Sequence, residues 1–433
     1  MYDREFILEY FNKFFDSITR VKIVKRDLSV DFVPQKCIVL IGPRRAGKTY
    51  FMWDHYKTRK NHSIYIDLEH SAFKKITHKD LFEILSIFEE HYNIKIKNVY
   101  LDEIQNLNEW ESLVRSLLDT GYNVMVTGSS SKFLSKEVAT QLRGRTLTYY
   151  LFPLSFREFL RFKDIRIQKH VSLSYKMKLL KYLKEFLDHG SYPEIVMRSS
   201  ESEKILREYY FMVLYKDFIE RFDISLPSLA KYIFEFCFQN YAKEISVNNI
   251  SQYIYSQTSK KMKDKIYEYV CKLEDTSAVF FVSKLSMKVT ERLSWPKKVY
   301  ICDLGLSSIL SFKQDIGKKM ENVVFLELKR RENTKPLQEV YYYKTREGYE
   351  VDFLIKEGME IKELMQVCYA NSYEEIPERE IRALLHAKEE LNLGDEVPLT
   401  VITWDYEDAR EVEWWRKRGK IRFVPLWKWL LQV

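Results

Sequence analysis

The stretch Val39-Leu40-Ile41-Gly42-Pro43-Arg44-Arg45-Ala46-Gly47-Lys48-Thr49 decides the fold of this chain. The apolar residues 37–41 predict a buried strand, and the residues after Thr49 predict the start of a helix. The loop between them ends in Gly-Lys-Thr, and two of the 12 glycines of the chain stand there at the spacing of a phosphate-binding loop. We interpret the stretch as a P-loop.

Each residue type in this loop has a chemical reason. A glycine at the start allows a tight turn, and a second glycine allows the backbone to approach a ligand closely. The loop amides and the helix N-terminus would converge on a phosphate. Lys48 would reach the β- and γ-phosphates, and the Thr49 hydroxyl would bind Mg²⁺. The residues expected to bind the nucleotide are Gly42, Pro43, Arg44, Arg45, Ala46, Gly47, Lys48 and Thr49.

The segments that follow the P-loop alternate between strands and helices. The pattern predicts strands at 62–69, 98–105 and 123–127 and helices at 78–92 and 110–119. Such alternation is typical of an α/β fold with a mostly parallel sheet that is covered by helices on both faces. Ligands of such sheets bind at the carboxyl ends of the strands, so we expect the chemistry there.

Acidic and hydroxyl side chains follow two of these strands. Asp102 and Glu103 end the strand at 98–105. We expect Asp102 to hold Mg²⁺ through its water shell and Glu103 to polarise an attacking water. The strand at 123–127 ends in Thr127-Gly128-Ser129, where a hydroxyl can hold the same water or the γ-phosphate. We place Ser129 first in that role and Thr127 second.

Two arginines, Arg143 and Arg145, flank Gly144 just past this strand. An arginine that reaches the γ-phosphate stabilises the charge of the transition state. Either arginine could act within its own chain or across an oligomer interface. A basic surface turn is an equally good interpretation.

Composition sets the broad class. The chain has 433 residues, 46% of them hydrophobic, and its length allows about two to four domains. It has no apolar run of membrane-spanning length, and residues 1–5 lack the pattern of a signal peptide, so we expect a cytoplasmic protein without a membrane partner. Five scattered cysteines indicate neither a disulfide framework nor a zinc site. The net charge of +8 is compatible with nucleic-acid binding without requiring it.

Four domains are expected along the chain. The P-loop core takes residues 1–154, and a helical segment rich in aromatic and basic residues takes 155–225. Helices followed by two strands suggest a winged helix at 226–296. Alternating helices and strands at 297–433 suggest a separate α/β domain.

The motifs GPRRAGKT, VYLDEIQ, VTGSSS and LRGRTLTYYLFPLSFREFL occur in this order. Together they resemble the archaeal and bacterial AAA-like P-loop ATPases, whose ASCE-type parallel-sheet core is followed by a helical lid, a winged helix and a C-terminal domain of unknown function (DUF4143 type). The blocks GSYPEIV, VYICDLGL, ENVVFLELKRR and QVCY extend the resemblance over nearly the whole chain. It implies ATP rather than GTP as the nucleotide, Mg²⁺ as the cofactor, and ATP hydrolysis.

In such proteins the C-terminal domain is similar to restriction endonucleases, which use a helix Glu, a strand Asp and a further acid or Gln, two residues before a Lys, to bind a metal and activate water. Glu321, Asp352 and Gln366 match the first three positions. Cys368 stands where the Lys should be, and a thiol supplies no ammonium charge. Lys344 is a candidate for a migrated lysine. We favour a degenerate domain that binds over an active nuclease.

Two functions remain open. The lysines near the second helix and the wing of the winged helix could contact phosphates, or they could form an ordinary solvated face: Lys260, Lys261, Lys263, Lys265, Lys272, Lys284 and Lys288. The first interpretation is an ATPase that acts on DNA. The second is a nucleotide-dependent switch that docks a protein partner. Either is compatible with an oligomer.

Overall fold

The computed structural model describes residues 4–73, 76–128, 142, 144–168, 170–258, 262–286, 288, 296–310 and 315–432. The chain separates into two compact units, Met1–Phe152 and Pro153–Val433. The first unit ends close to residue 154, the expected end of the P-loop core. Ser129, Arg143, Lys260 and Lys261 lie outside the described residues.

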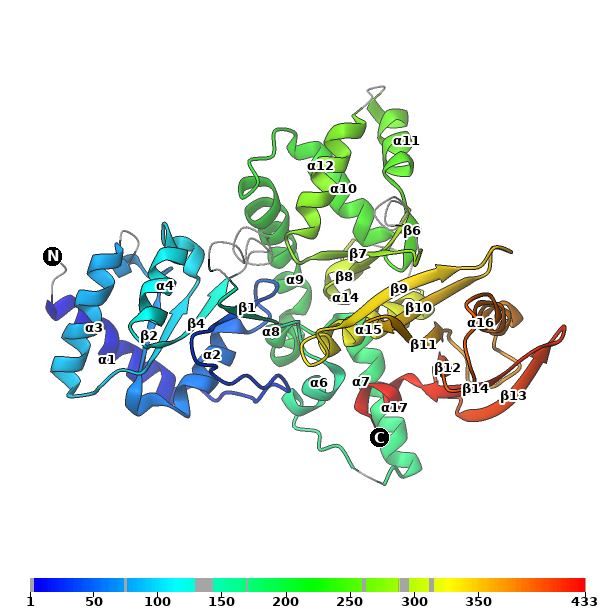
Figure 1. Cartoon of the computed structure of the whole chain (residues 1–433), viewed down its shortest axis with the longest axis horizontal. Helices are drawn as coiled ribbons and strands as arrows, with labels where there is room; N and C mark the ends of the chain where they lie inside the picture. The colour runs from blue at the N-terminus through cyan, green and yellow to red at the C-terminus, as the bar shows by residue number, and fades with distance from the viewer. Residues whose placement is uncertain are drawn as a thin grey trace. The chain divides into compact units, whose positions relative to one another are not determined.

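The first unit is built on a five-stranded parallel sheet in the order β2-β3-β4-β1-β5 (Figure 1). The strands are β1 (Cys37–Ile41), β2 (Ser63–Asp67), β3 (Asn98–Asp102), β4 (Asn123–Gly128) and β5 (Thr146–Tyr150). β1 lies between β4 and β5. The P-loop that follows β1 therefore lies at the carboxyl ends of the strands, next to the end of β4. This confirms the parallel sheet that the sequence predicts.

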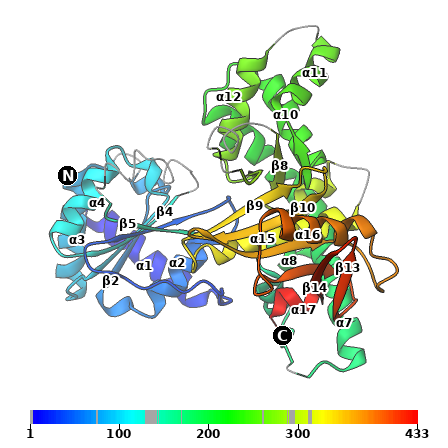
Figure 2. The same cartoon turned by 45° about the vertical axis from the view of Figure 1, so that its right-hand side comes forward.

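Helices cover both faces of this sheet (Figure 2). They are α1 (Arg4–Arg20), α2 (Lys48–Lys57), α3 (His78–Tyr92) and α4 (Trp110–Asp119). Successive strand residues face opposite cores because side chains alternate along a strand. Val39 therefore packs in the core with α3 and α4, whereas Leu40 packs with α2 on the other face. Burial on both faces explains why the strands are continuous apolar runs.

The second unit begins with helices. They are α6 (Phe156–Phe162), α7 (Leu173–His189), α8 (Pro193–Met197), α9 (Ser202–Phe211) and a π-helix at Met212–Glu220. α6 starts with a capping box, in which Ser155 accepts from the backbone of Glu158 and the Glu158 carboxylate accepts from the backbone of Ser155. This reciprocal capping fixes the helix start directly after the first unit ends.

A second group of helices surrounds a small antiparallel sheet. Its elements are α10 (Pro227–Gln239), β6 (Lys243–Ile245), α11 (Val247–Thr258), α12 (Lys263–Glu274), β7 (Val279–Ser283) and β8 (Lys297–Ile301). The strands pair in the order β6-β8-β7. The expected boundary between 296 and 297 therefore cuts this sheet, because β8 is its central strand.

The last part of the second unit is a six-stranded mixed sheet in the order β13-β14-β12-β11-β10-β9. Its elements are α14 (Leu304–Ser308), α15 (Ile316–Arg331), β9 (Gln338–Lys344), β10 (Glu350–Glu357), β11 (Glu360–Val367), α16 (Glu378–Glu390), β12 (Leu399–Thr403), β13 (Asp408–Trp414), β14 (Lys417–Pro425) and α17 (Leu426–Leu431). Helix α15 is buried over most of its length and contacts β8 of the small sheet as well as β9 and β11 of the large one. The two sheets thus share this helix.

Candidate functional site

The P-loop is seated against the end of β5. The Leu151 amide donates to the carbonyl of Ile41 over 2.8 Å. Gly42 has a φ of +145°, and a Cβ on it would lie 2.1 Å from the carbonyl oxygen of Leu151. A side chain there would force the two segments apart, so glycine is required at the point where β1 turns into the loop.

Lys48 extends back into the loop. Its side chain is 5% exposed, and its ammonium donates to the carbonyls of Gly42 over 2.9 Å and Pro43 over 3.0 Å. A phosphate in the loop would offer this ammonium charged acceptors, which form stronger hydrogen bonds than neutral carbonyls do. The geometry suits a charge that neutralises the β- and γ-phosphates.

Asp102 ends β3 in a buried position, where it is 2% exposed. One carboxylate oxygen accepts from the Tyr65 hydroxyl over 2.8 Å, and the other accepts from the Thr127 hydroxyl. The Thr49 hydroxyl also bonds to Asp102. Burial raises the pKa of the Asp102 carboxyl, and the hydrogen bonds from Thr127, Tyr65 and Thr49 oppose that shift.

The donor set around Asp102 fits a magnesium ion. A hydroxyl and a carboxylate are hard oxygen ligands, and Mg²⁺ in phosphate sites uses one or two such groups together with phosphate oxygens and water. A cation beside Asp102 would also relieve the cost of burying its charge. Thr49 and Asp102, from two different elements, are the residues that would hold the ion.

Glu103 follows Asp102 with left-handed backbone, at a φ of 52°. Its amide donates to the Thr127 hydroxyl over 2.9 Å, and its carboxylate accepts from the side-chain amide of Gln105. Left-handed backbone at a residue other than glycine is costly and is found where surrounding contacts impose it. These contacts hold the Glu103 carboxylate in one direction at the carboxyl end of β3.

Thr127 joins the two acids, since its hydroxyl donates to Asp102 and accepts from the Glu103 amide. The sequence suggests a direct role for Thr127 on water or phosphate as the second choice after Ser129. In the structure the Thr127 hydroxyl is engaged by the two acids, so Thr127 is placed to position them.

Arg145 lies at the amino ends of the strands, whereas the P-loop lies at their carboxyl ends. Its carbonyl accepts from the amide of Cys37, the first residue of β1, and its guanidinium pairs with Asp119 over 2.5 Å. The P-loop begins after the far end of β1, about 15 Å away at the rise of a strand. The structure therefore does not bring Arg145 to the phosphate site of its own chain.

Arg26 was missed by the sequence reasoning. It is 8% exposed, and its guanidinium donates to the carbonyl of Ala46 in the P-loop and to that of Phe152. Residues 21–33 carry no motif, and Arg26 stands between Lys25 and Asp27, so nothing in the local sequence marks it as a contact of the P-loop.

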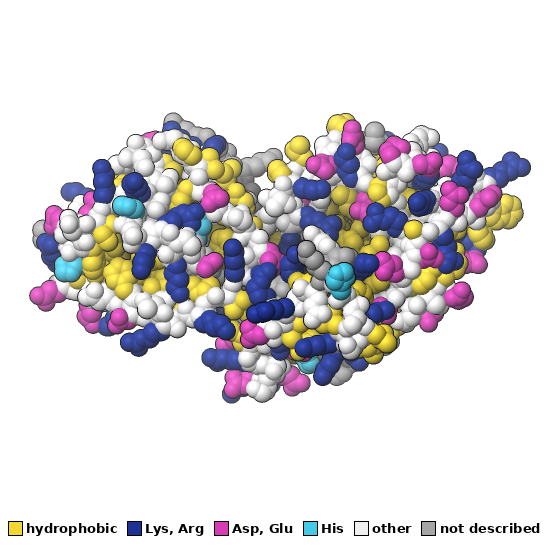
Figure 3. Space-filling model, turned by 90° about the horizontal axis from the view of Figure 1, so that it is seen from below, with side chains coloured by type: hydrophobic (Ala, Val, Ile, Leu, Met, Phe, Trp, Pro, Cys, Tyr) yellow, Lys and Arg dark blue, Asp and Glu magenta, His cyan; other side chains and the backbone are white. Residues whose placement is uncertain are grey.

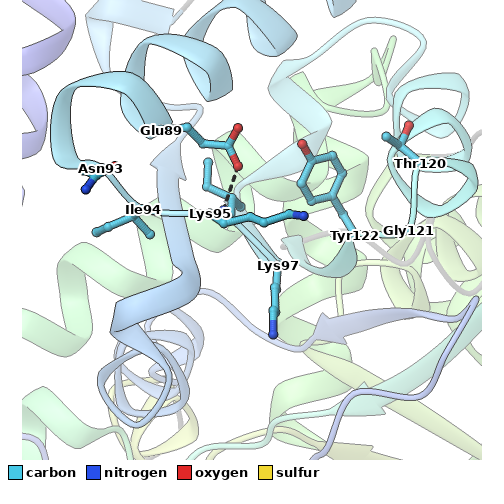
Figure 4. A pocket seen from close by; sticks show the side chains of 9 residues that line it. Glu89, Asn93, Ile94, Lys95, Lys97, Thr120, Gly121 and Tyr122 are labelled. Atoms are coloured by element: carbon cyan, nitrogen blue, oxygen red, sulfur yellow. Dashed lines mark hydrogen bonds between the residues drawn. The ribbon is translucent and has the colours of Figure 1, made fainter.

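A surface pocket of about 690 Å³ lies at the starts of β3 and β4 (Figure 4). In it the Glu89 carboxylate accepts from the Ile96 amide over 2.7 Å. The lining residues are Glu89, Asn93, Ile94, Lys95, Ile96, Lys97, Thr120, Gly121 and Tyr122. Because the P-loop lies at the opposite ends of the strands, this pocket is separate from the nucleotide site.

A second cluster of charged residues lies in the last part of the chain. Glu321 of α15, Asp352 of β10 and Gln366 of β11 come together there. The ammonium between Glu321 and Asp352 belongs to Lys298 of β8, at 3.0 and 2.8 Å. Lys344 lies to the side, bonded to Glu244 over 3.0 Å.

Cys368 is buried, and burial raises the pKa of its thiol to about 12, so it is uncharged at neutral pH. Lys298 was missed because it precedes the three matched residues and belongs to another sheet. Across the ranges that the structure describes, no group of three or more His, Cys, Asp or Glu is arranged to hold a metal ion.

The central P-loop strand, the acid-bearing β3 next to β4, and the 2-3-4-1-5 order of parallel strands define a P-loop ATPase of AAA type. Family models agree: an AAA domain matches residues 34–160, a domain of unknown function (DUF8612) matches 180–316, and a second one (DUF4143) matches 316–414. The chain belongs to the family of AAA-like ATPases that carry a C-terminal DUF4143 domain.

Two relatives are similar to this protein over more than nine-tenths of the chain. An uncharacterized protein of Methanocaldococcus jannaschii is 39% identical over 415 residues, which cover 95% of this chain and 92% of that protein. An uncharacterized protein of Haemophilus influenzae is 25% identical over 413 residues, which cover 91% of this chain and 94% of that protein.

Two solved structures are similar to parts of the chain. The Walker-type ATPase of Pyrococcus abyssi has a TM-score of 0.40 at 13% identity and covers 72% of this chain and 96% of its own. Replication initiator DnaA bound to AMPPCP and single-stranded DNA has a TM-score of 0.28 at 12% identity, with 55% and 82% covered. Within the described part of the chain, no helix is both long and apolar enough to cross a membrane.

Proposed function

We propose that this protein binds ATP and hydrolyses it with Mg²⁺ as cofactor. The observation that carries the proposal is the network beside the P-loop, in which Thr49 and Asp102 bond to each other and Thr127 joins Asp102 to Glu103. Bound Mg²⁺ would neutralise charge on the phosphate oxygens. Lys48 binds the β- and γ-phosphates, and Glu103 orients and polarises the attacking water. Because the proposed reaction consumes ATP, we expect it to take place in the cytoplasm.

Two variants separate binding from chemistry. Lys48→Ala should lower both ATP binding and turnover, because the loop loses its ammonium. Glu103→Gln should retain ATP binding and lower turnover by about a hundredfold or more, the range expected for a lost general base. Glu109→Gln is the matched control, since Glu109 is an exposed acid six residues further on. Turnover of Glu103→Gln at the parent rate would show that another group activates the water.

The proposed target is DNA, contacted by a winged helix. The order α10, β6, α11, α12, β7, β8 and the sheet order β6-β8-β7 support this assignment, with α12 as the helix that would enter a groove. Lys263, at the start of α12, and Lys288, after β7, are both exposed and suit phosphate contacts.

Other lysines of this region support the DNA proposal less. Lys265 bonds to the Ser225 hydroxyl over 3.1 Å, and Lys272 pairs with Glu268 over 2.5 Å. Figure 3, which draws the side seen from below in Figure 1, shows Lys and Arg side chains interspersed with Asp and Glu over that face. Because Lys265 and Lys272 have partners, a phosphate interface near α12 would rest on a few lysines.

The second candidate function is a switch that docks a protein. Exposed tyrosines favour it: Tyr253 and Tyr255 of α11 are 47% and 50% exposed, and Tyr267 of α12 is 52% exposed. Tyrosine is enriched in protein interfaces. Measuring ATP turnover with duplex, branched and single-stranded DNA at several salt concentrations separates the two functions. Stimulation that weakens steeply with salt supports DNA, and no stimulation and no binding support a protein partner.

Because Arg145 lies at the amino ends of the strands, an arginine finger at Arg145 would have to act across an oligomer interface. Mixing Arg145→Ala with Lys48→Ala chains tests this. Each variant alone should be slow, and the mixture should recover activity because intact P-loops meet intact arginines. Parent turnover by Arg145→Ala alone would remove the arginine from the mechanism.

A further inference from the structure

The ammonium of Lys298 lies at the centre of three carboxylates. Its Nζ is 3.0 Å from an oxygen of Glu321, 2.8 Å from one of Glu350 and 2.8 Å from one of Asp352. The Lys298 side chain is 2% exposed. An ammonium has three N–H donors, so three carboxylate oxygens from α15 and β10 satisfy it completely.

Other polar atoms of this cluster are also engaged. The Tyr300 hydroxyl donates to Glu321 over 2.7 Å, and the Val367 amide donates to the second oxygen of Asp352 over 3.0 Å. The side-chain oxygen of Gln366 accepts from the Asp352 amide over 2.5 Å. That oxygen is the atom through which Gln366 would bind a metal, so the third expected ligand is turned to the backbone.

The spacing of the cluster fits an ammonium and not a magnesium ion. The three Nζ to oxygen distances of 2.8 to 3.0 Å are those of charged hydrogen bonds. Magnesium requires oxygen ligands at about 2.0–2.1 Å in octahedral geometry. While the Lys298 ammonium separates them, the carboxylates cannot close by the almost one ångström that a magnesium ion would require. With Lys298 among them, the residues present therefore do not fit the metal that the endonuclease resemblance implies.

The charges agree with the geometry. Burial lowers the pKa of Lys298, but Asp352 and Glu321 outweigh it and hold the pKa well above its usual value, so the side chain is an ammonium. Burial raises the pKa of Glu321 to about 7, and the neighbouring Asp352 adds to this. Without a cation, several carboxylates would be buried without compensation, which is strongly unfavourable.

We propose that Lys298 is the resident cation of the Glu321, Glu350 and Asp352 site, so that the native protein binds no divalent metal there. The lysine comes from the central strand of the small sheet and its partners from α15 and the large sheet. The site therefore fastens the two sheets together. A domain built in this way can bind a partner, but it lacks the metal needed to activate water for phosphodiester cleavage.

Removing the lysine should open a divalent-cation site. In Lys298→Ala, without nucleotide, electron paramagnetic resonance should count one more bound Mn²⁺ per chain than in the parent. Thermal unfolding of this variant should shift up by about 5 °C or more when Mn²⁺ replaces EDTA, beyond any shift of the parent. Adding Asp352→Asn to the variant should abolish both gains. A folded Lys298→Ala that gains no Mn²⁺ would overturn the proposal.

Lys344→Ala is the matched control. Lys344 lies 3.9 Å from Glu350 and 3.0 Å from Glu244, is 35% exposed at its side chain, and should create no new site when removed. If Lys298→Ala does not fold, the number of bound Mn²⁺ ions per chain is compared between the parent and Asp352→Asn. Equal numbers support the proposal. A lower number in Asp352→Asn would overturn it. Metal-dependent DNA cleavage by the parent that Asp352→Asn abolishes, with ATP turnover unchanged, would also overturn it.

Discussion

The Nη1 atom of Arg26 donates a 2.8 Å hydrogen bond to the carbonyl of Ala46, inside the P-loop. The Nη2 atom of the same guanidinium donates over 2.7 Å to the carbonyl of Phe152, the last residue of the first unit. A buried guanidinium thus contacts the P-loop and links it to Phe152, the residue at which the chain leaves the ATPase core. The loop and this exit point are linked through one side chain.

We expect Arg26→Met to weaken nucleotide binding by about tenfold or more. The loop loses a charged hydrogen bond of the kind that contributes about 1.5–3 kcal/mol, and it loses nearby positive potential. Titration calorimetry with ADP measures the effect. Arg59→Met is the control, because Arg59 pairs with Asp31 near the surface and does not contact the loop. Equal affinities of the two variants would show that Arg26 only stabilises the fold.

Thr127→Val should lower turnover by about ten- to a hundredfold and change the Kd for ATP by less than about threefold. The hydroxyl that joins Asp102 to the Glu103 amide is lost, so the two acids lose their fixed relation, and misplaced catalytic groups reduce the rate more than binding. Steady-state kinetics and nucleotide binding are measured side by side. Thr127→Ser keeps the hydroxyl and should restore most of the rate. If the serine variant is as slow as the valine variant, the hydroxyl is not responsible.

Charge reversal at Lys263 and Lys288 together should weaken DNA binding equally for all sequences. It should reduce the slope of log affinity against log salt by about two, because each lysine would contact one phosphate. Fluorescence anisotropy at several salt concentrations measures both quantities. Reversal at Lys181 and Lys184, two exposed lysines of α7, makes the same change in net charge elsewhere. If both double variants lose affinity alike, the effect comes from net charge and not from a local interface.

The P-loop and its acids could be predicted because their signals are local. Strand, glycine loop and helix follow each other within 20 residues, and parallel strands bring their carboxyl ends to one edge. Lys298 and Arg26 were missed because their partners are far along the chain: Lys298 lies 54 residues from Asp352, and Arg26 lies 20 residues from Ala46. The endonuclease pattern expects the ammonium at the position of Cys368, two residues after Gln366, whereas the fold supplies it from another sheet.

The hairpin of β13 and β14 was also missed. Its turn residues, Trp415 and Arg416, both have left-handed backbone, with φ values of 46° and 65°. Asn and Gly usually occupy such turns because they tolerate positive φ. A turn made from a tryptophan and an arginine therefore carries none of the residue types by which hairpins are predicted.

Asp303 gives the protein a pH-dependent stability. It is 1% exposed and accepts from the amide and hydroxyl of Ser191, at 2.6 and 2.9 Å, and from the Gly305 amide over 2.8 Å. Burial nevertheless raises the pKa of its carboxyl to about 6. An unfolded aspartate has a pKa of about 3.9, so the folded protein binds this proton more tightly. Its contribution to stability is present below about pH 4 and is lost as the pH rises to about 6.

The free energy of unfolding of the parent should therefore fall between pH 4 and pH 7 by up to about 3 kcal/mol through Asp303 alone. Asp303→Asn cannot titrate and should lack this part of the pH dependence. Urea unfolding of the parent and the variant at both pH values measures it as a double difference, in which other titrating groups cancel. Asp223→Asn makes the same change at an exposed aspartate and should behave as the parent does. A pH dependence in Asp303→Asn as large as that of the parent would show that Asp303 stays ionised at pH 4, with the Ser191 and Gly305 donors outweighing the cost of burial.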